Sequence, residues 1–348
     1  MKKISILSLD GGGIRDIIPG VVLSYLEKRL QSLDNSELKI GDYFDFIAGT
    51  STGGILACTY LVKGEDGKAK YSAEEALNLY LQEGNKIFHK DIRTKVKSGF
   101  GLLDEKYGDD ALQENLKRIF EDLLLSSFIK PCLITAYEIT SRSAYFFNSA
   151  DSLIHSMYDF KIRDVARSTS AAPTYFEPAK VQSQSGQTFY FIDGGMFANN
   201  PALCAYAEAR KLKFSEILKR EDKPDLPSAK DMITVSVGTG TVKKPYYFSD
   251  LKNAGELGWI QPVIDILMSG NTETVDYQLA QMYETLSGKN KNNYYRLEPS
   301  LREALSEMDL ATSANLENLK QAGLWFVNKN KETLDEIAGK IYDNYVTT

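Results

Sequence analysis

The chain has 348 residues, a formal net charge of -6, 25% charged residues and 43% hydrophobic residues. These proportions are ordinary for a globular protein, and the length suffices for one large domain or two smaller ones. The acidic balance argues against a nucleic acid polymer as partner, because phosphate recognition normally leaves a surplus of basic residues.

Short apolar runs alternate with stretches of helical periodicity along the whole chain. In chain order, the runs that predict strands are Ile4–Leu9, Phe44–Ala48, Cys132–Ile139, Ala144–Phe147, Phe189–Ile192 and Met232–Val237. The stretches that predict helices lie at about Pro19–Ser32, Ala73–Phe88, Asp110–Leu125, Pro201–Leu218 and Ala314–Tyr345. This alternation predicts a three-layer α/β/α fold with a largely parallel central sheet.

No internal repeat or Pro-rich linker divides the chain. We therefore expect a single domain over residues 1–348, with a motif-bearing core at about 4–240 and a helical part at about 255–348 packed on it. The first apolar run is short for a signal peptide, and none approaches the roughly 20 residues of a spanning helix. This pattern predicts a cytoplasmic protein. The widely spaced Cys58, Cys132 and Cys204 are expected to be reduced packing residues.

A serine lies in a turn between a predicted strand and a predicted helix. The segment Gly49-Thr50-Ser51-Thr52-Gly53 fits the G-x-S-x-G pattern, and we expect the helix to begin near Gly53. Gly49 and Gly53 would allow strand and helix to close on a strained backbone at Ser51, with the hydroxyl at the sheet's C-terminal edge. This context favours Ser51 as a nucleophile over an ordinary turn residue.

A serine nucleophile needs a base, which is usually histidine. The two histidines of the chain, His89 and His155, do not follow strands with glycine support, and we expect each to be at the surface or partly packed. Asp193 is the better candidate, because it ends an apolar strand and precedes Gly194 and Gly195. These glycines would allow close backbone approach, whereas the alternative is a simple Asp-Gly turn.

The segment Asp10–Asp16, with the sequence DGGGIRD, follows the first predicted strand. Successive glycines at such a place expose backbone N–H groups that can hold a dinucleotide pyrophosphate or the oxyanion of an acyl-transfer intermediate. Asp16 occupies the last glycine position of the dinucleotide pattern, where a carboxylate is unfavourable. The oxyanion hole is therefore favoured, with Arg15 either adding positive charge or bracing the loop.

These three segments, in this order, resemble the patatin-like phospholipase family, with its DGGGxRG loop, GxSxG turn and DGG or DGA aspartate. The resemblance extends through Ala166–Pro173, Met268–Leu279 and Asn293–Arg296, and so covers most of the chain. It departs at Asp16, where the family usually has glycine. Because an aspartate suits the first turn of a helix, we expect a changed loop rather than an inactive site.

The resemblance implies a Ser-Asp dyad without histidine that hydrolyses fatty acyl esters of membrane phospholipids, as a phospholipase A or lysophospholipase does. Carried over by position, Ser51 is the nucleophile, Asp193 the base, and Gly11, Gly12 and Gly13 the oxyanion donors. No metal or other cofactor is implied. Two alternatives stay open, namely an acyltransferase with the same acyl-enzyme and a non-catalytic lipid- or nucleotide-binding module. The resemblance to bacterial relatives also suggests activation by a cyclic nucleotide or by a protein partner.

Two segments are candidates for lipid contact. Lys86–Leu103 interleaves apolar side chains with basic ones, and its residues 86–97 carry five positive charges against one negative charge. Such a pattern suits an anionic membrane surface, although a solvated helix end with apolar residues facing the core is the simpler alternative. The aromatic stretch Tyr246–Trp259 is expected either to line a lid or acyl pocket or to pack in the core.

Overall fold

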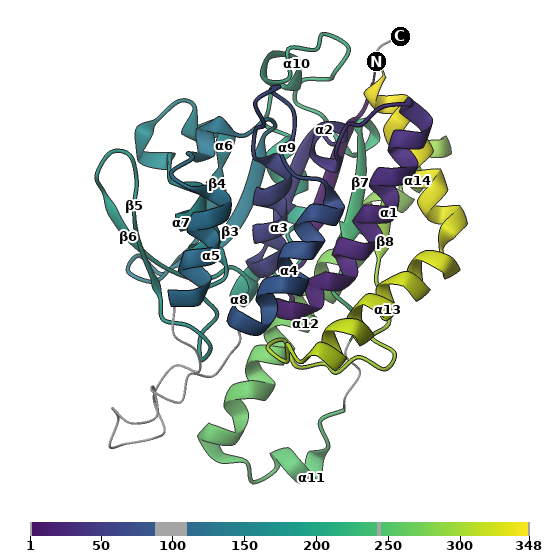
Figure 1. Ribbon diagram of the computed structural model, residues 1–348. Coiled ribbons are helices and arrows are strands. Elements are labelled where there is room, and N and C mark those ends of the chain that lie inside the picture. The colour runs from purple at the N-terminus through teal and green to yellow at the C-terminus, as the bar shows by residue number, and fades with distance from the viewer. Residues whose placement is uncertain (1, 88–109, 242–244, 347–348) are drawn as a thin grey trace.

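The computed structural model describes residues 2–87, 110–241 and 245–346. Within them, one eight-stranded sheet has the order β5-β6-β3-β2-β1-β7-β8, with β4 paired to β3 outside that path (Figure 1). The strands are β1 (Ile4–Leu9), β2 (Phe46–Gly49), β3 (Cys132–Glu138), β4 (Ser143–Asn148), β5 (Ala179–Gln182), β6 (Thr188–Asp193), β7 (Met232–Val237) and β8 (Tyr294–Leu297). The pairs among β3, β2, β1, β7 and β8 are parallel, and those of β4, β5 and β6 are antiparallel.

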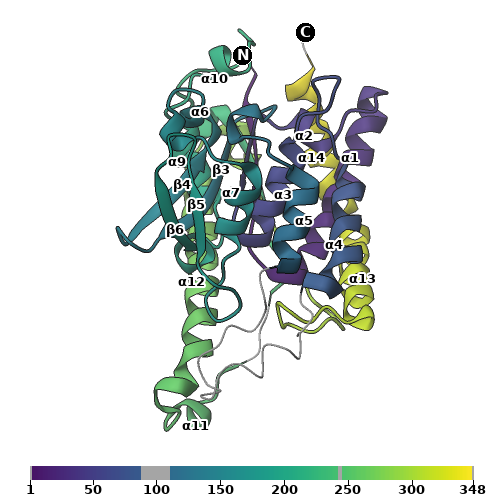
Figure 2. The ribbon, with the colours of Figure 1, turned by 60° about the vertical axis from the view of Figure 1, so that its left-hand side comes forward.

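Helices cover both faces of the sheet, which confirms the predicted three-layer α/β/α fold (Figure 2). On one face lie α1 (Ile17–Asp34), α3 (Ser51–Leu61), α4 (Ala73–Ile87), α5 (Asp110–Phe120), α7 (Ile162–Thr169), α13 (Ser313–Lys329) and α14 (Lys331–Tyr345). On the other lie α8 (Gly195–Ala198), α9 (Ala202–Ala209) and α12 (Gly255–Glu284). The short helices α2 (Ile40–Tyr43), α6 (Ser149–Ser152), α10 (Phe214–Ile217) and α11 (Phe248–Leu251) lie in the connections.

The alternation of side chains along β1 shows how one strand serves two cores. Leu7 and Leu9 belong to the larger core under α1 and α3, whereas Ile4 and Ile6 belong to the smaller core under α9 and α12. All four are fully buried. Successive side chains of a strand point to opposite faces, so a strand covered on both faces is apolar along most of its length. The two polar residues of β1, Ser5 and Ser8, are buried as well.

The structure divides two of the predicted helices. The stretch predicted at Ala314–Tyr345 breaks at Asn330, which is non-helical (φ -113°, ψ 22°) and donates from Nδ2 to the carbonyl of Phe326 at 2.9 Å. The stretch predicted at Pro201–Leu218 breaks between α9 and α10, because the Asp225 side chain accepts the Ser215 amide at 2.9 Å and starts a new helix. The helical periodicity of the apolar residues continues through both breaks, so neither break was predicted.

Strands β5 and β8, both four residues long, were not predicted, and α12 was not predicted as one helix of 30 residues. Pro262 lies inside α12, where it interrupts the sequence signal for a continuous helix. Figures 1 and 2 show α11 and the first turns of α12 extending beyond the rest of the molecule. No helix in the described parts of the chain is both long and apolar enough to cross a membrane.

Candidate active site

The turn between β2 and α3 holds Ser51 in the backbone conformation expected of a nucleophile turn. Its φ is 54°, in the left-handed region that costs a non-glycine residue roughly 1–3 kcal/mol. A Cβ on Gly49 would lie 2.5 Å from the Gly53 carbonyl oxygen, and one on Gly53 would lie 2.3 Å from the Asp10 carbonyl oxygen. Both glycines are therefore required by close backbone approach. The helix begins at Ser51 itself, two residues earlier than predicted.

Strand β3 brings Ser51 and Asp193 together. Leu133 of β3 pairs with both β2 and β4, and Ala136 pairs with both β6 and β4. Strand β4 therefore occupies one edge of β3, while β2 and β6 share the other. Because β6 is antiparallel to β3, its C-terminal end meets that of β2 head-on. Asp193 therefore reaches Ser51 through an antiparallel strand and not through a neighbouring parallel one.

The Ser51 hydroxyl donates to Oδ2 of Asp193 at 2.6 Å. The other carboxylate oxygen, Oδ1, accepts the Gly195 amide at 2.7 Å, which fixes the plane of the carboxylate. Burial raises the pKa of Asp193 to about 6, against the opposing effects of these two hydrogen bonds and of Arg167. The carboxylate is therefore a stronger base than an ordinary aspartate, and it already contacts the proton it would remove.

The glycines after Asp193 and a threonine from α7 complete the support of the pair. A Cβ on Gly194 would lie 2.0 Å from Oγ1 of Thr135, so a side chain is excluded there. The Ser51 amide donates to Oγ1 of Thr169 at 2.8 Å. Sequence reasoning missed the role of Thr169, although it lies in the Ala166–Pro173 segment that carried part of the resemblance.

The three loop glycines have different surroundings. The Gly11 amide donates to the Asn199 carbonyl at 3.1 Å, so that N–H is occupied, and a Cβ on Gly11 would lie 2.9 Å from Cβ of Ser51. The Gly12 amide reaches Oγ1 of Thr52 at 3.4 Å. Gly13 has a φ of 63° and faces the same pocket as Ser51. Its amide has no hydrogen-bond partner among the described residues.

An ion pair from β8 anchors the start of this loop. Both carboxylate oxygens of Asp10 accept from Arg296, at 3.0 and 2.6 Å, and Arg296 also donates to Ser236 at 2.8 Å and to Glu298. Burial raises the pKa of Asp10 to about 6, and the arginine limits the rise. Arg15 braces the loop from within, because its Nε donates to the Gly12 carbonyl at 3.2 Å.

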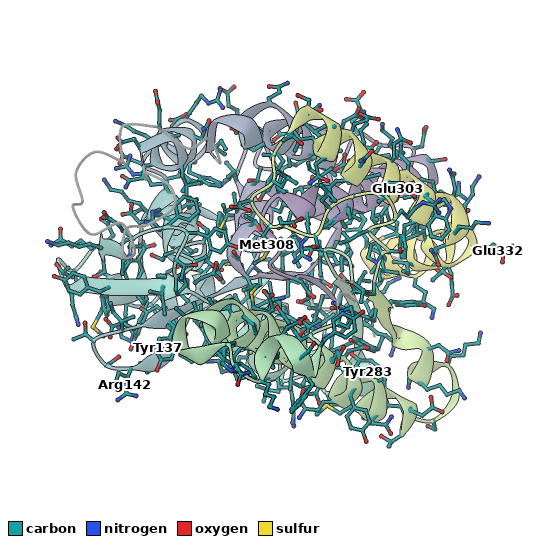
Figure 3. The ribbon with its side chains drawn as sticks, turned by 90° about the horizontal axis from the view of Figure 1, so that it is seen from below. Tyr137, Arg142, Tyr283, Glu303, Met308 and Glu332 are labelled. Carbon is teal, nitrogen blue, oxygen red and sulfur yellow. The ribbon has the colours of Figure 1, made fainter. Side chains whose placement is uncertain are left out.

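Ser51 and Asp193 open into an apolar pocket that encloses about 1080 Å³ of empty space, part of it continuous with solvent. Its lining includes Ile55, Leu79, Leu112, Leu116, Phe176, Met196, Ile264, Met268 and Met308. Met308 lies near the centre of the face seen from below in Figure 3, and its carbonyl accepts the Ile14 amide at 2.8 Å. Such a pocket suits a long apolar ligand held with its polar end at the dyad.

The other candidate residues lie away from the pair. His155 is exposed, whereas His89 and residues 88–103 of the basic segment lie outside the described residues. The aromatic stretch Tyr246–Trp259 was predicted to line a lid or the acyl pocket or to pack in the core. Its exposed aromatic residues, none of which is among those that line the pocket, are Tyr246, Tyr247, Phe248 and Trp259. The predictions of core packing and of pocket lining are therefore wrong for these residues. Cys58 and Cys132 are buried free thiols. The described residues contain no cluster that could hold a metal ion.

Comparison with known proteins identifies relatives over nearly the whole chain. The family model described as Patatin-like phospholipase matches residues 7–206. Patatin-like protein 1 of Arabidopsis thaliana is 34% identical over 340 residues, which cover 92% of this chain and 80% of that protein. Patatin-like protein 4 of the same plant is 33% identical over 345 residues, with 94% and 84% covered.

A solved structure, that of VipD from Legionella pneumophila, superposes on 94% of this chain and 67% of its own, with 11% sequence identity. Its TM-score of 0.37 is too low to support an argument about fold or function.

Proposed function

Because the chain belongs to the patatin-like phospholipase family, which makes it broadly a lipid acyl hydrolase, we propose that it cleaves fatty acyl esters of phospholipids through Ser51 and Asp193. The proposed substrate is a membrane phospholipid or lysophospholipid, taken up at a bilayer surface by a cytoplasmic enzyme. The observation that carries the proposal is the 2.6 Å hydrogen bond from Ser51 to Asp193 at the base of an apolar pocket.

In the proposed reaction, Ser51 Oγ attacks the acyl carbonyl carbon while its proton passes to Asp193. The negative charge that develops on the carbonyl oxygen faces the Gly13 amide, because the Gly11 amide is already bonded to Asn199 and the Gly12 amide to Thr52. Collapse of this intermediate breaks the ester bond, and the departing alcohol takes the proton from Asp193. Water then attacks the acyl-enzyme, with Asp193 again as base, and releases the fatty acid.

We expect wild-type protein to release fatty acid from mixed phospholipid vesicles and the S51A variant to release none above background. Mass spectrometry of the products would identify the head group and the acyl position attacked. His155→Ala is the control, because this exposed histidine contacts neither dyad residue, and it should match wild type. Release by S51A at the wild-type rate, or loss of release in H155A, would contradict the proposed dyad.

The pH dependence of kcat/KM tests the proposed base. Only ionised Asp193 can accept the serine proton, so kcat/KM on a soluble ester should rise with pH through a midpoint near 6 and level off above it. The H155A variant should show the same midpoint, because the proposed reaction uses no histidine. A profile without a rise between about pH 5 and about pH 7 would be inconsistent with Asp193 as base.

A further inference from the structure

Asp16, the residue that departs from the glycine-loop pattern, makes a specific contact next to the nucleophile. It is the last residue of the 3₁₀ turn Gly13–Asp16 and is 1% exposed. Its Oδ2 accepts the hydroxyl of Thr52, the residue that follows Ser51. Its Oδ1 is buried without a hydrogen-bond partner among the described residues. Among the described residues, Thr52 is therefore the hydrogen-bond partner of the Asp16 side chain.

Thr52 in turn links the nucleophile turn to the glycine loop. A hydroxyl has one proton, and because Thr52 gives it to Asp16, its oxygen lone pairs face the Gly12 amide at 3.4 Å. The backbone carbonyl of Thr52 accepts the Tyr80 hydroxyl at 2.6 Å, which holds the same residue from the α4 side. The direction of the Thr52 hydroxyl therefore decides whether its oxygen can accept from Gly12.

The contact does not require a charge on Asp16. Burial raises the pKa of Asp16 well above its ordinary value, opposed by the Thr52 hydrogen bond and by Arg15 and reinforced by Asp10 and Asp193. Both the carboxylate and the protonated acid keep an oxygen that can accept a hydrogen bond. An asparagine side chain keeps such an oxygen too, whereas alanine does not.

We propose that Asp16 is a positioning residue that acts through Thr52 and Gly12 to hold the Gly13 amide opposite Ser51. The inference rests on the proposed function, because the Gly13 amide is the one assigned to the developing oxyanion. Removing the acceptor frees the Thr52 hydroxyl to turn, and the Gly12 amide then loses its partner. The expected defect is in the chemical step, because the apolar pocket that binds the acyl chain is unchanged.

The test is steady-state hydrolysis of p-nitrophenyl butyrate by D16A, D16N, T52V and the double variant D16A/T52V. We expect D16A and T52V each to lower kcat at least about tenfold while KM changes less than about threefold. D16N should recover most of the loss, and the double variant should be no slower than the slower single variant. Thr59→Val is the control, because this buried threonine of the same helix donates only to the Ile55 carbonyl at 2.8 Å.

Losses that multiply in the double variant, or a D16N variant as slow as D16A, would overturn the inference. If D16A does not fold, T52V and D16N decide between the outcomes, since the first must lose rate and the second must retain it. Turnover by wild type that is lost in S51A but unchanged in D16A and T52V would overturn this inference alone. A wild type without turnover on the ester or on vesicles would overturn the proposed function and the inference together.

Discussion

Replacing Asp193 with asparagine is expected to remove most of the hydrolytic activity and, at neutral pH, to make the folded protein more stable. Loss of the base should lower kcat by at least about 10³-fold, because the amide cannot take the serine proton. In the wild type the Gly195 amide donates to Asp193 at 2.7 Å. The asparagine side chain keeps an oxygen that can accept this hydrogen bond, so the site should remain folded. Initial rates on a soluble ester measure the loss of activity.

The gain in stability follows from the raised pKa of Asp193. The folded pKa is about 6 against an ordinary value of 3.8, so the folded state holds this proton more tightly than the unfolded state. Stability therefore falls as pH rises from about 4 to about 6 and remains reduced above that range. Asparagine has no such proton, and D193N should exceed wild type by about 1–3 kcal/mol above pH 7, with no difference below about pH 4.

Urea unfolding of wild type and D193N at several pH values measures this difference. Asp343→Asn is the matched control, because Asp343 is exposed on α14, and it should leave stability within about 0.5 kcal/mol of wild type at every pH. A D193N variant that is active, or that is less stable than wild type at pH 8, would show that Asp193 is not the buried, destabilising base proposed above.

Replacing Arg296 with alanine is expected to cause a large loss of stability. The side chain of Arg296 is 11% exposed and that of Asp10 is 3% exposed, so the substitution leaves a carboxylate buried without its bidentate partner. Breaking such a pair by removing one member costs about 3–5 kcal/mol. The glycine loop follows Asp10 directly, and activity should fall with stability because the loop loses its anchor.

The R296A loss should depend on pH in a defined direction. Without the arginine, burial holds the folded pKa of Asp10 further above its ordinary value, so the variant regains stability as pH falls and the acid is protonated. Urea unfolding of wild type and R296A at pH 8 and at pH 5 measures the loss of stability at each pH. Arg302→Ala is the control, since this exposed arginine lies over the Trp325 ring at 4.4 Å, and it should cost less than about 1 kcal/mol. Equal losses for the two arginines would contradict a buried ion pair.

The sequence by itself determined the layered fold and the two residues of the proposed dyad. Strands buried on both faces are mostly apolar, and β1 and β7 were predicted with the bounds that the structure has. The requirement for Gly49 is local, because a Cβ there would meet Gly53, whereas a Cβ on Gly53 would meet the Asp10 carbonyl after β1. Such a steric demand selects glycines at fixed spacing, and that spacing is visible in the sequence.

Only the tertiary structure decided what surrounds those residues. Thr169 holds the Ser51 amide across 118 positions, and Arg296 holds Asp10 across 286. The approach of Asp193 depends on β6 pairing antiparallel to β3, which no local pattern encodes. Apolar periodicity records which face of a segment is buried, whereas the strand or side chain that covers it depends on how distant segments pack. Asp16 illustrates the difference, since its partner Thr52 became identifiable only once the glycine loop and the nucleophile turn lay side by side.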